Sequence, residues 1–139
     1  MTAAAQSDAA GFPVREGERR WTTAEITKVR TQLASEAAEL REEIDKAESD
    51  IADRLGDSVS EAGDDQADVG AKTYEREHEL ALTYNARDLL VQTERALARI
   101  EAGTYGSCES CGQPIGKARL QAFPRATLCV RCKQREERR

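Results

Sequence analysis

Aromatic residues and histidine are scarce in this chain of 139 residues. Aromatics make up 4% of the sequence, and His78 is the only histidine. A compact globule of this size normally has more large apolar side chains to bury. With 34% charged residues, the composition favours long, solvent-exposed helices that meet along a narrow apolar seam. The length corresponds to one domain. We assign no function to His78, because a lone histidine on a helix is more often a packed or surface residue.

Long apolar runs are missing as well. No segment approaches the roughly 18–20 apolar residues that cross a bilayer, and the first residues lack the basic and apolar regions of a secretory signal. We therefore expect a cytoplasmic protein without a membrane-spanning segment. The sequence also lacks a phosphate-binding loop and any pairing of histidine with a nucleophile, so we do not expect an enzyme.

Residues 1–21 are predicted to form a disordered N-terminal arm. The segment is dominated by Ala, Ser, Gly, Pro and charged residues, and Phe12 and Val14 are its only large apolar side chains before Trp21. So few apolar groups cannot offset the entropy lost on ordering a chain segment.

A long helix is predicted to begin at Thr22. Thr22 and Glu25 fit a capping box, and Trp21 with Ile26 fit the hydrophobic staple that often accompanies one. Apolar residues then recur in alternating steps of three and four, which is the seam pattern of a coiled coil. The seam residues are Ile26, Val29, Leu33, Ala37, Leu40, Ile44, Ala47, Ile51 and Leu55. Gly56 is predicted to end the helix.

A second helix is predicted to begin between Asp65 and Ala71 and to end before Gly103. Two long helices joined by a short connection form an antiparallel hairpin, which we place at residues 22–103 with its tip at residues 56–70. The apolar stripe of the second helix is less regular. It comprises Tyr74, His78, Leu82, Ala86, Leu90, Leu97 and Ile100.

The predicted tip is acidic. Between Arg54 and Lys72 there is no basic residue, and there are five acids: Asp57, Glu61, Asp64, Asp65 and Asp68. A solvated turn would account for a charge run. However, clustered acidic side chains repel one another in the absence of cations, and this repulsion brings no evident structural benefit. The tip is therefore a candidate functional site.

All four cysteines fall within 25 residues, as two C-x-x-C pairs: Cys108 with Cys111, and Cys129 with Cys132. This spacing predicts one tetrahedral zinc site per chain, with the four cysteines as its ligands. Four thiolates saturate zinc and leave no position for water, so we expect a structural and not a catalytic ion. Paired disulfides would need an oxidising compartment, and a thioredoxin-like redox motif would need a βαβ context.

The cysteine-containing segment is also the basic part of the chain. From Thr104 onward there are eight basic and three acidic residues, against 13 basic and 23 acidic in the remainder. A mainly acidic body argues against general binding to duplex DNA. The predicted fold class is all-α with a small zinc-binding module. A long antiparallel coiled-coil hairpin is followed, at residues 104–139, by a four-cysteine zinc finger and a short C-terminal helix.

Several segments of the sequence resemble one known family. YGSCESCG (residues 105–112), RLQAFP (119–124) and LCVRCK (128–133) are similar to the C4 zinc finger of the DksA/TraR family. DDQADVG (64–70) and YERE (74–77) resemble the coiled-coil tip of that family and the start of its second helix. The resemblance covers most of the chain from about Thr22 onward.

The resemblance implies a transcription regulator that binds bacterial RNA polymerase and not DNA. It implies that the hairpin enters the secondary channel of the polymerase, with its tip near the catalytic magnesium. Asp65 and Asp68 match the two acids of the family's D-x-x-D-x-A tip motif, Asp64 adjoins them, and Gly70 replaces the alanine. Candidate docking residues on the basic segment are Arg119, Arg125, Arg131 and Lys133.

A response to the alarmone ppGpp is not expected. Of the positions that carry basic residues in the responsive family member, Gln92 and Phe123 are not basic here, and only Lys133 keeps the base. Two alternative functions stay open at this point: a zinc-finger protein that binds nucleic acid through its basic segment, and a coiled-coil interaction protein unrelated to polymerase. We expect a monomer.

Overall fold

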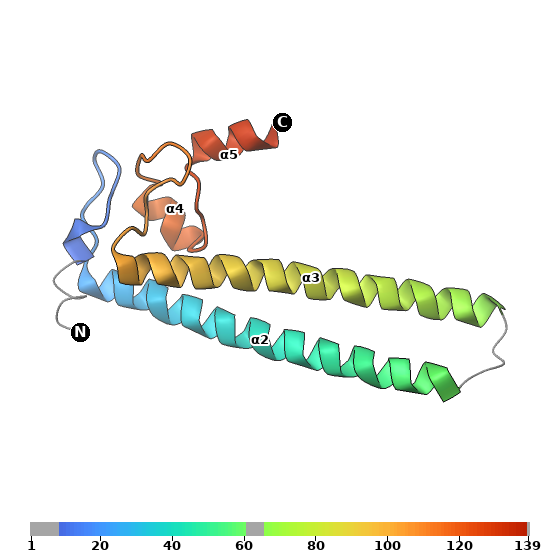
Figure 1. The fold of residues 1–139 in the computed structure, drawn as a ribbon. Helices are drawn as coiled ribbons and strands as arrows, with labels where there is room; N and C mark the ends of the chain where they lie inside the picture. Colours follow the sequence, from blue (N-terminus) through green and yellow to red (C-terminus); the bar gives the residue numbers. More distant parts are fainter. Residues whose placement is uncertain (1–8, 61–65, 139) are drawn as a thin grey trace. The chain divides into compact units, whose positions relative to one another are not determined.

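The computed structural model describes residues 9–60 and 66–138. In chain order its elements are η1 (Ala9–Gly11), α2 (Thr23–Ser60), α3 (Gln66–Ala102), α4 (Lys117–Ala122) and α5 (Val130–Glu137) (Figure 1). The only β-type pairing among the described residues is an isolated bridge between Ser107 and Pro114. The predicted all-α class with a small cysteine-containing module is confirmed.

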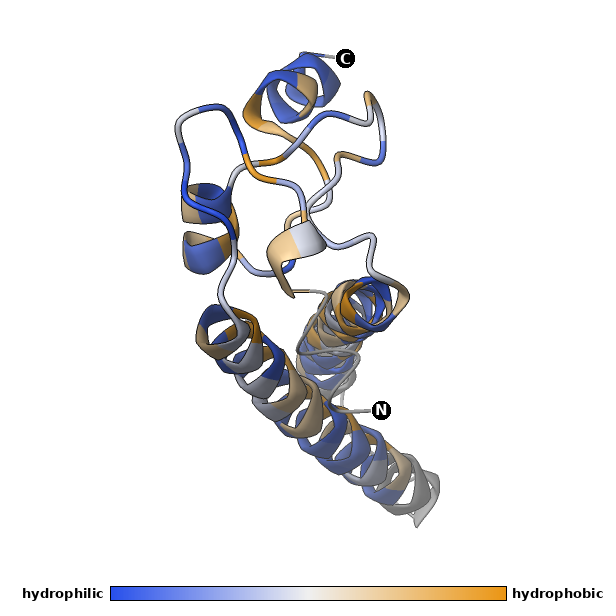
Figure 2. Cartoon of the chain, turned by 90° about the vertical axis from the view of Figure 1, so that its left-hand side faces the viewer, coloured by the Kyte–Doolittle hydropathy of each residue, from blue (hydrophilic) through white to orange (hydrophobic). Residues whose placement is uncertain are grey.

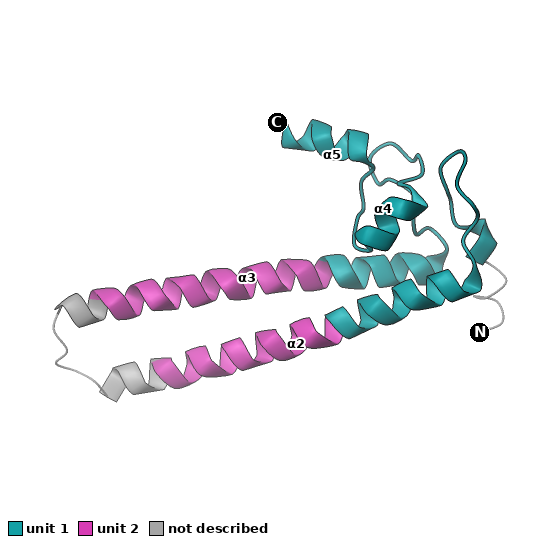
Figure 3. Ribbon diagram, turned by 180° about the vertical axis from the view of Figure 1, so that it is seen from behind, with its two compact units in different colours: residues 1–36, 92–139 teal, residues 37–91 magenta. Residues whose placement is uncertain are grey.

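The chain divides into two compact units (Figure 3). We call residues 1–36 with 92–139 the base unit, and residues 37–91 the arm unit. The base unit contains the start of α2, the end of α3, and both short helices. The arm unit contains the remaining parts of the two long helices.

The two long helices run antiparallel in the arm unit. Arg87 on α3 pairs with Glu48 on α2, and Arg54, further along α2, pairs with Glu79, which comes earlier in α3. Both helices carry stripes of hydrophilic and hydrophobic residues (Figure 2). This patterning is typical of helices that pack along one narrow seam. The predicted hairpin is therefore confirmed.

The start of α2 agrees closely with the sequence. The Thr22 amide donates to Glu25 Oε1 at 2.9 Å, and the Glu25 amide donates to Thr22 Oγ1 at 3.2 Å, which completes the capping box. Trp21 and Ile26 are each only 2% exposed, as expected of a hydrophobic staple. All predicted seam residues of α2 from Ile26 to Ile51 are buried or half-buried. Leu55 lies outside the described side chains.

The predicted end of α2 is wrong. The helix continues through Gly56 to Ser60. A helical glycine costs only about 1 kcal/mol relative to alanine, which the rest of a long helix can offset. The start of α3 at Gln66 and its end before Gly103 are confirmed. Gly103 adopts φ +80°, the left-handed conformation that favours glycine at this position.

The seam of α3 differs from the predicted stripe. Leu82 and Tyr74 are exposed, by 54% and 73%, whereas Thr83 and Thr93 are buried. Thr83 is tolerated there because its hydroxyl donates to the Glu79 carbonyl at 2.9 Å, so burial does not leave this hydroxyl unsatisfied. The seam of α3 thus includes buried threonines, which a count of apolar side chains does not identify.

Residues 9–21 do not form the disordered arm predicted for residues 1–21. Ala9 and Phe12 belong to the core of the base unit, and the Phe12 ring lies edge-on to Tyr105 with centroids 6.3 Å apart. Trp21 packs on the same tyrosine at 6.2 Å. The prediction failed because it counted apolar residues without a partner surface. Tyr105 and other core residues of the zinc module supply that surface. Residues 1–8 lie outside the described residues.

The buried Phe12 gives a direct test of this correction. We expect Phe12→Ala to lower the free energy of unfolding of the zinc-loaded chain by about 3 kcal/mol, the usual cost of truncating a buried phenylalanine. Deleting residues 1–20 should lower the free energy of unfolding by at least the same amount. Urea unfolding measures both. The exposed Glu16→Ala is the matched control and should change little. A deletion as stable as the full chain would contradict this packing.

Candidate functional site

The first cysteine pair lies in a tight turn. The Cys108 amide donates to the Gln113 carbonyl at 2.8 Å, and the Gly112 amide donates back to the Cys108 carbonyl at 2.9 Å. Gly112 has φ +77°, a conformation that side-chain-bearing residues rarely adopt. The turn therefore fixes the backbone between Cys108 and Cys111.

The second pair forms the start of α5. Cys129 is the N-cap residue, and its Sγ accepts a hydrogen bond from the Cys132 amide at 3.5 Å. The C-x-x-C spacing thus coincides with the N-cap and third positions of a helix, which brings both sulfurs to one end of α5. The Glu109 amide donates to the Thr127 carbonyl at 2.9 Å and joins the two cysteine segments.

The sulfur atoms of the four cysteines form one cluster. All lie within 4.8 Å of one another, and Cys111 Sγ is 3.8 Å from Cys129 Sγ. A tetrahedral site with Zn–S bonds of about 2.3 Å has S···S edges of about 3.8 Å, so the geometry fits zinc. Cys108 and Cys132 are buried, and Cys111 is exposed.

The surroundings of the sulfurs favour a bound cation. Burial raises the pKa of Cys108, but hydrogen bonds from the backbone of Cys111, Cys129 and Ser110 outweigh this effect and lower it to about 6. The neighbouring Cys129 sulfur raises the pKa of Cys132 to about 12. Several adjacent thiolates repel one another unless a metal ion compensates their charge.

Arg99, near the end of α3, supports the first cysteine turn. Its guanidinium donates to the carbonyls of Thr104, at 3.0 Å, and Ser107, and lies 3.9 Å from the Glu109 carboxylate. Sequence reasoning missed this residue. A basic residue in the last turn of a helix is a common C-terminal feature, so nothing in the sequence distinguished it.

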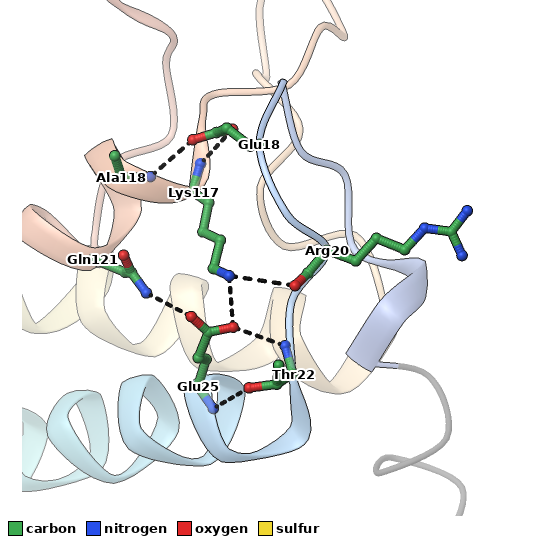
Figure 4. Close-up of polar contacts among 7 residues, drawn as sticks. All are labelled: Glu18, Arg20, Thr22, Glu25, Lys117, Ala118 and Gln121. Atoms are coloured by element: carbon green, nitrogen blue, oxygen red, sulfur yellow. Dashed lines mark hydrogen bonds and ion pairs between the residues drawn. The ribbon is translucent and has the colours of Figure 1, made fainter. Parts of the chain in front are cut away.

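A second support comes from the N-terminal segment (Figure 4). Glu18 accepts hydrogen bonds from the Lys117 and Ala118 amides, at 3.0 and 3.1 Å, at the start of α4. Lys117 Nζ in turn lies 2.6 Å from Glu25 Oε1. The hydrogen bond from Lys117, together with the Thr22 amide, lowers the pKa of Glu25 to about 2. Gln121 also donates to Glu25, at 3.2 Å. Both glutamates thus join segments about 100 residues apart in sequence.

A basic cleft of about 660 Å³ adjoins the cysteine site. The basic residues that line the cleft are Arg95, Arg119, Arg125, Lys133 and Arg135. Two acidic residues, Glu109 and Glu136, line it as well. Three of the four docking residues predicted from the sequence are therefore brought together here, and Arg131 is exposed but does not line the cleft.

Comparison with known proteins accounts for this arrangement. Residues 103–138 match the prokaryotic DksA/TraR C4-type zinc finger. The protein named RNA polymerase-binding transcription factor DksA in Escherichia coli K12 is 32% identical over 122 residues, which cover 88% of this chain and 78% of that protein. The chain belongs to the DksA/TraR family.

Other members of the DksA/TraR family are also similar. The Caulobacter vibrioides protein of the same name is 44% identical over 75 residues, which are 54% of this chain and only 53% of that protein. The solved structure of transcription factor DksA2 from Pseudomonas aeruginosa has a TM-score of 0.66 and 32% identity, covering 83% of this chain and 84% of that one.

The family match and the sulfur geometry together assign one structural zinc ion to the four cysteines. When bound, zinc closes the tetrahedron and stabilises the fold of a module too small to hold itself together.

Of the tip residues shared with the DksA/TraR family, Asp64 and Asp65 lie outside the described residues. Asp68 lies within α3, and its side chain is not among those described. Gly70 is exposed, and a Cβ built on it would meet nothing within 4 Å. In the parts of the chain that the structure describes, no helix has an apolar stretch of the length that a bilayer crossing requires.

The zinc assignment predicts that folding of the base unit depends on metal. We expect one zinc per chain by elemental analysis, and Cys108→Ser or Cys129→Ser should unfold residues 104–138 because metal binding and folding are coupled there. Limited proteolysis reports on this segment directly. Gln113→Ala, an exposed change in the first cysteine turn, should leave zinc content unchanged. Full protection from proteolysis after chelation would be inconsistent with the assignment.

Proposed function

We propose that the chain is a regulator of transcription that binds bacterial RNA polymerase and acts without catalysing a reaction itself. The observation that carries the proposal is the likeness to the Escherichia coli DksA protein across 88% of this chain, including the zinc finger. Because the match to the Caulobacter vibrioides protein spans about half of that relative, polymerase binding by this chain is a proposal. Its place of action would be the cytoplasm.

The division of charge between the two units supports this function. The arm unit carries 16 acidic and 6 basic residues, and the base unit carries 10 acidic and 15 basic residues. A strongly acidic helical arm is repelled by nucleic acid phosphates, whereas basic surfaces and metal ions attract it. An arm of this kind suits the polymerase secondary channel, which leads to a magnesium site. A nucleic-acid-binding arm would need the opposite charge.

The zinc site argues for structure and not catalysis. Four thiolate ligands leave zinc no open position at which water or a substrate could be activated. The only histidine, His78, is exposed on α3 in the arm unit, far along the chain from any cysteine. These features support a regulator that works by binding.

The tip supplies the proposed regulatory action. Asp65 and Asp68 match the family's tip acids, and we place them near the catalytic magnesium and its moving elements. Polymerase docking would involve the basic cleft, through Arg119, Arg125 and Lys133. Binding of this kind requires neither a second copy of the chain nor direct DNA contacts. A ppGpp response is not part of the proposal, since Gln92 and Phe123 stand where the responsive member has basic residues.

Neutralising the tip acids should separate binding from regulation. We expect Asp65→Asn with Asp68→Asn to keep polymerase affinity within roughly tenfold, because single exposed charges contribute little. The same variant should lose most of its effect on initiation in a purified transcription assay. Glu61→Gln, which neutralises a neighbouring acid outside the motif, is the matched control. If the double variant regulates as well as the wild type, the acids are only a solvated turn.

Substitution of Gly70, near the same tip, should change regulation in the opposite direction. Gly70→Ala should stabilise α3 by about 0.5–1 kcal/mol, since alanine is the better helix former and the added methyl group has open space. It also restores the family's tip pattern, so regulation should strengthen. Thermal unfolding and the same transcription assay measure the two effects. A less stable helix, or weaker regulation, would count against this role of residue 70.

A further inference from the structure

A notch of about 160 Å³ lies between the two long helices of the arm unit. Ile44 and Ala47 line it from α2, and Leu82 and Ala86 line it from α3. Ile44 and Ala86 are buried, at 8% and 4% exposure, so they form the floor. Ala47 and Ala86 are small, which leaves the space that larger seam residues would fill.

Leu82 stands at the edge of this notch with 54% of its surface exposed. The seam position beside it is taken by Thr83, which is 4% exposed and satisfied by its bond to the Glu79 carbonyl. Leu82 therefore adds little to the packing of the hairpin. An exposed apolar side chain beside an apolar hollow with carboxylates at its rim is a feature of protein interfaces.

The charges around the notch indicate which kind of partner side chains could bind there. Glu43, Asp50 and Glu79 line the notch, and Glu79 pairs with Arg54. The arm unit as a whole has a net charge of −10. A partner that fills the notch must therefore present basic residues around an apolar one. A second arm unit does not meet this requirement, because two such surfaces repel each other.

We propose that this notch is a docking point on RNA polymerase, which inserts one aliphatic or aromatic side chain flanked by Lys or Arg. The inference rests on the proposed function and adds a specific contact to it. In this view Leu82 and the notch floor supply affinity along the side of the hairpin, separately from the acidic tip.

The first test removes the apolar contact. The full zinc-loaded chain is titrated against purified core polymerase, as wild type, Leu82→Ser and Val91→Ser. Val91 is the matched control, because it is 56% exposed on the same helix but does not line the notch. We expect Leu82→Ser to weaken binding about fivefold to tenfold, as for one lost apolar contact, and Val91→Ser to weaken it less than about twofold. Thermal unfolding verifies that both variants stay folded.

The possible results separate the two claims. No saturable binding by the wild type would overturn both the proposed function and the notch. Wild-type binding with equal affinities for the two variants would overturn the notch alone. Loss of self-association by Leu82→Ser in sedimentation, without a change in polymerase binding, would assign the notch to a second copy and also overturn the inference.

A second pair of variants tests the charge of the rim. Glu43→Gln with Asp50→Asn should weaken polymerase binding and reduce its dependence on salt, since two attractive charges are removed. Glu42→Gln with Asp45→Asn removes the same charge from exposed positions of α2 that do not line the notch. Equal effects of the two pairs would show that only net charge matters and would refute a local docking point.

Discussion

The base unit depends on four thiolates meeting at a single metal ion. The segment from Thr104 to Arg138 contains three short pieces of regular structure, the helices α4 and α5 and one bridge, which bury too little apolar surface to fold alone. Structural zinc in such modules contributes an apparent binding free energy of about 10–16 kcal/mol. Zinc therefore fixes the position of Tyr105, and with it the core that Phe12 and Trp21 complete.

This dependence explains why the N-terminal segment is ordered. Phe12 and Trp21 pack on Tyr105. Glu18 binds the backbone amides at the start of α4, and Glu25 pairs with Lys117. Each contact joins the beginning of the chain to a segment that zinc has folded. The basic cleft used for docking in our proposal is built on the same scaffold.

The sequence predicts those features that rest on local patterns. The capping box at Thr22, the seam of α2 and the paired C-x-x-C motifs each need only a few neighbouring residues, and all are present. The order of residues 9–21 and the role of Arg99 were missed, because both depend on partners distant in sequence. The assignment of Leu82 to the seam was wrong for a local reason. Apolar counting could not foresee that Thr83 would satisfy its hydroxyl within the helix and take the buried position.

We propose that both units of this chain contact RNA polymerase, and that the arm unit lies within the secondary channel. Cross-linking mass spectrometry of the zinc-loaded chain with core polymerase tests it most directly, because lysines occur in both units. We predict links from Lys46 and Lys72 in the arm unit to residues that line the channel, together with links from Lys133 in the base unit to the outer surface beside it. Links from the arm unit only to outer surfaces of polymerase, or no links to polymerase at all, would refute this placement of the arm unit.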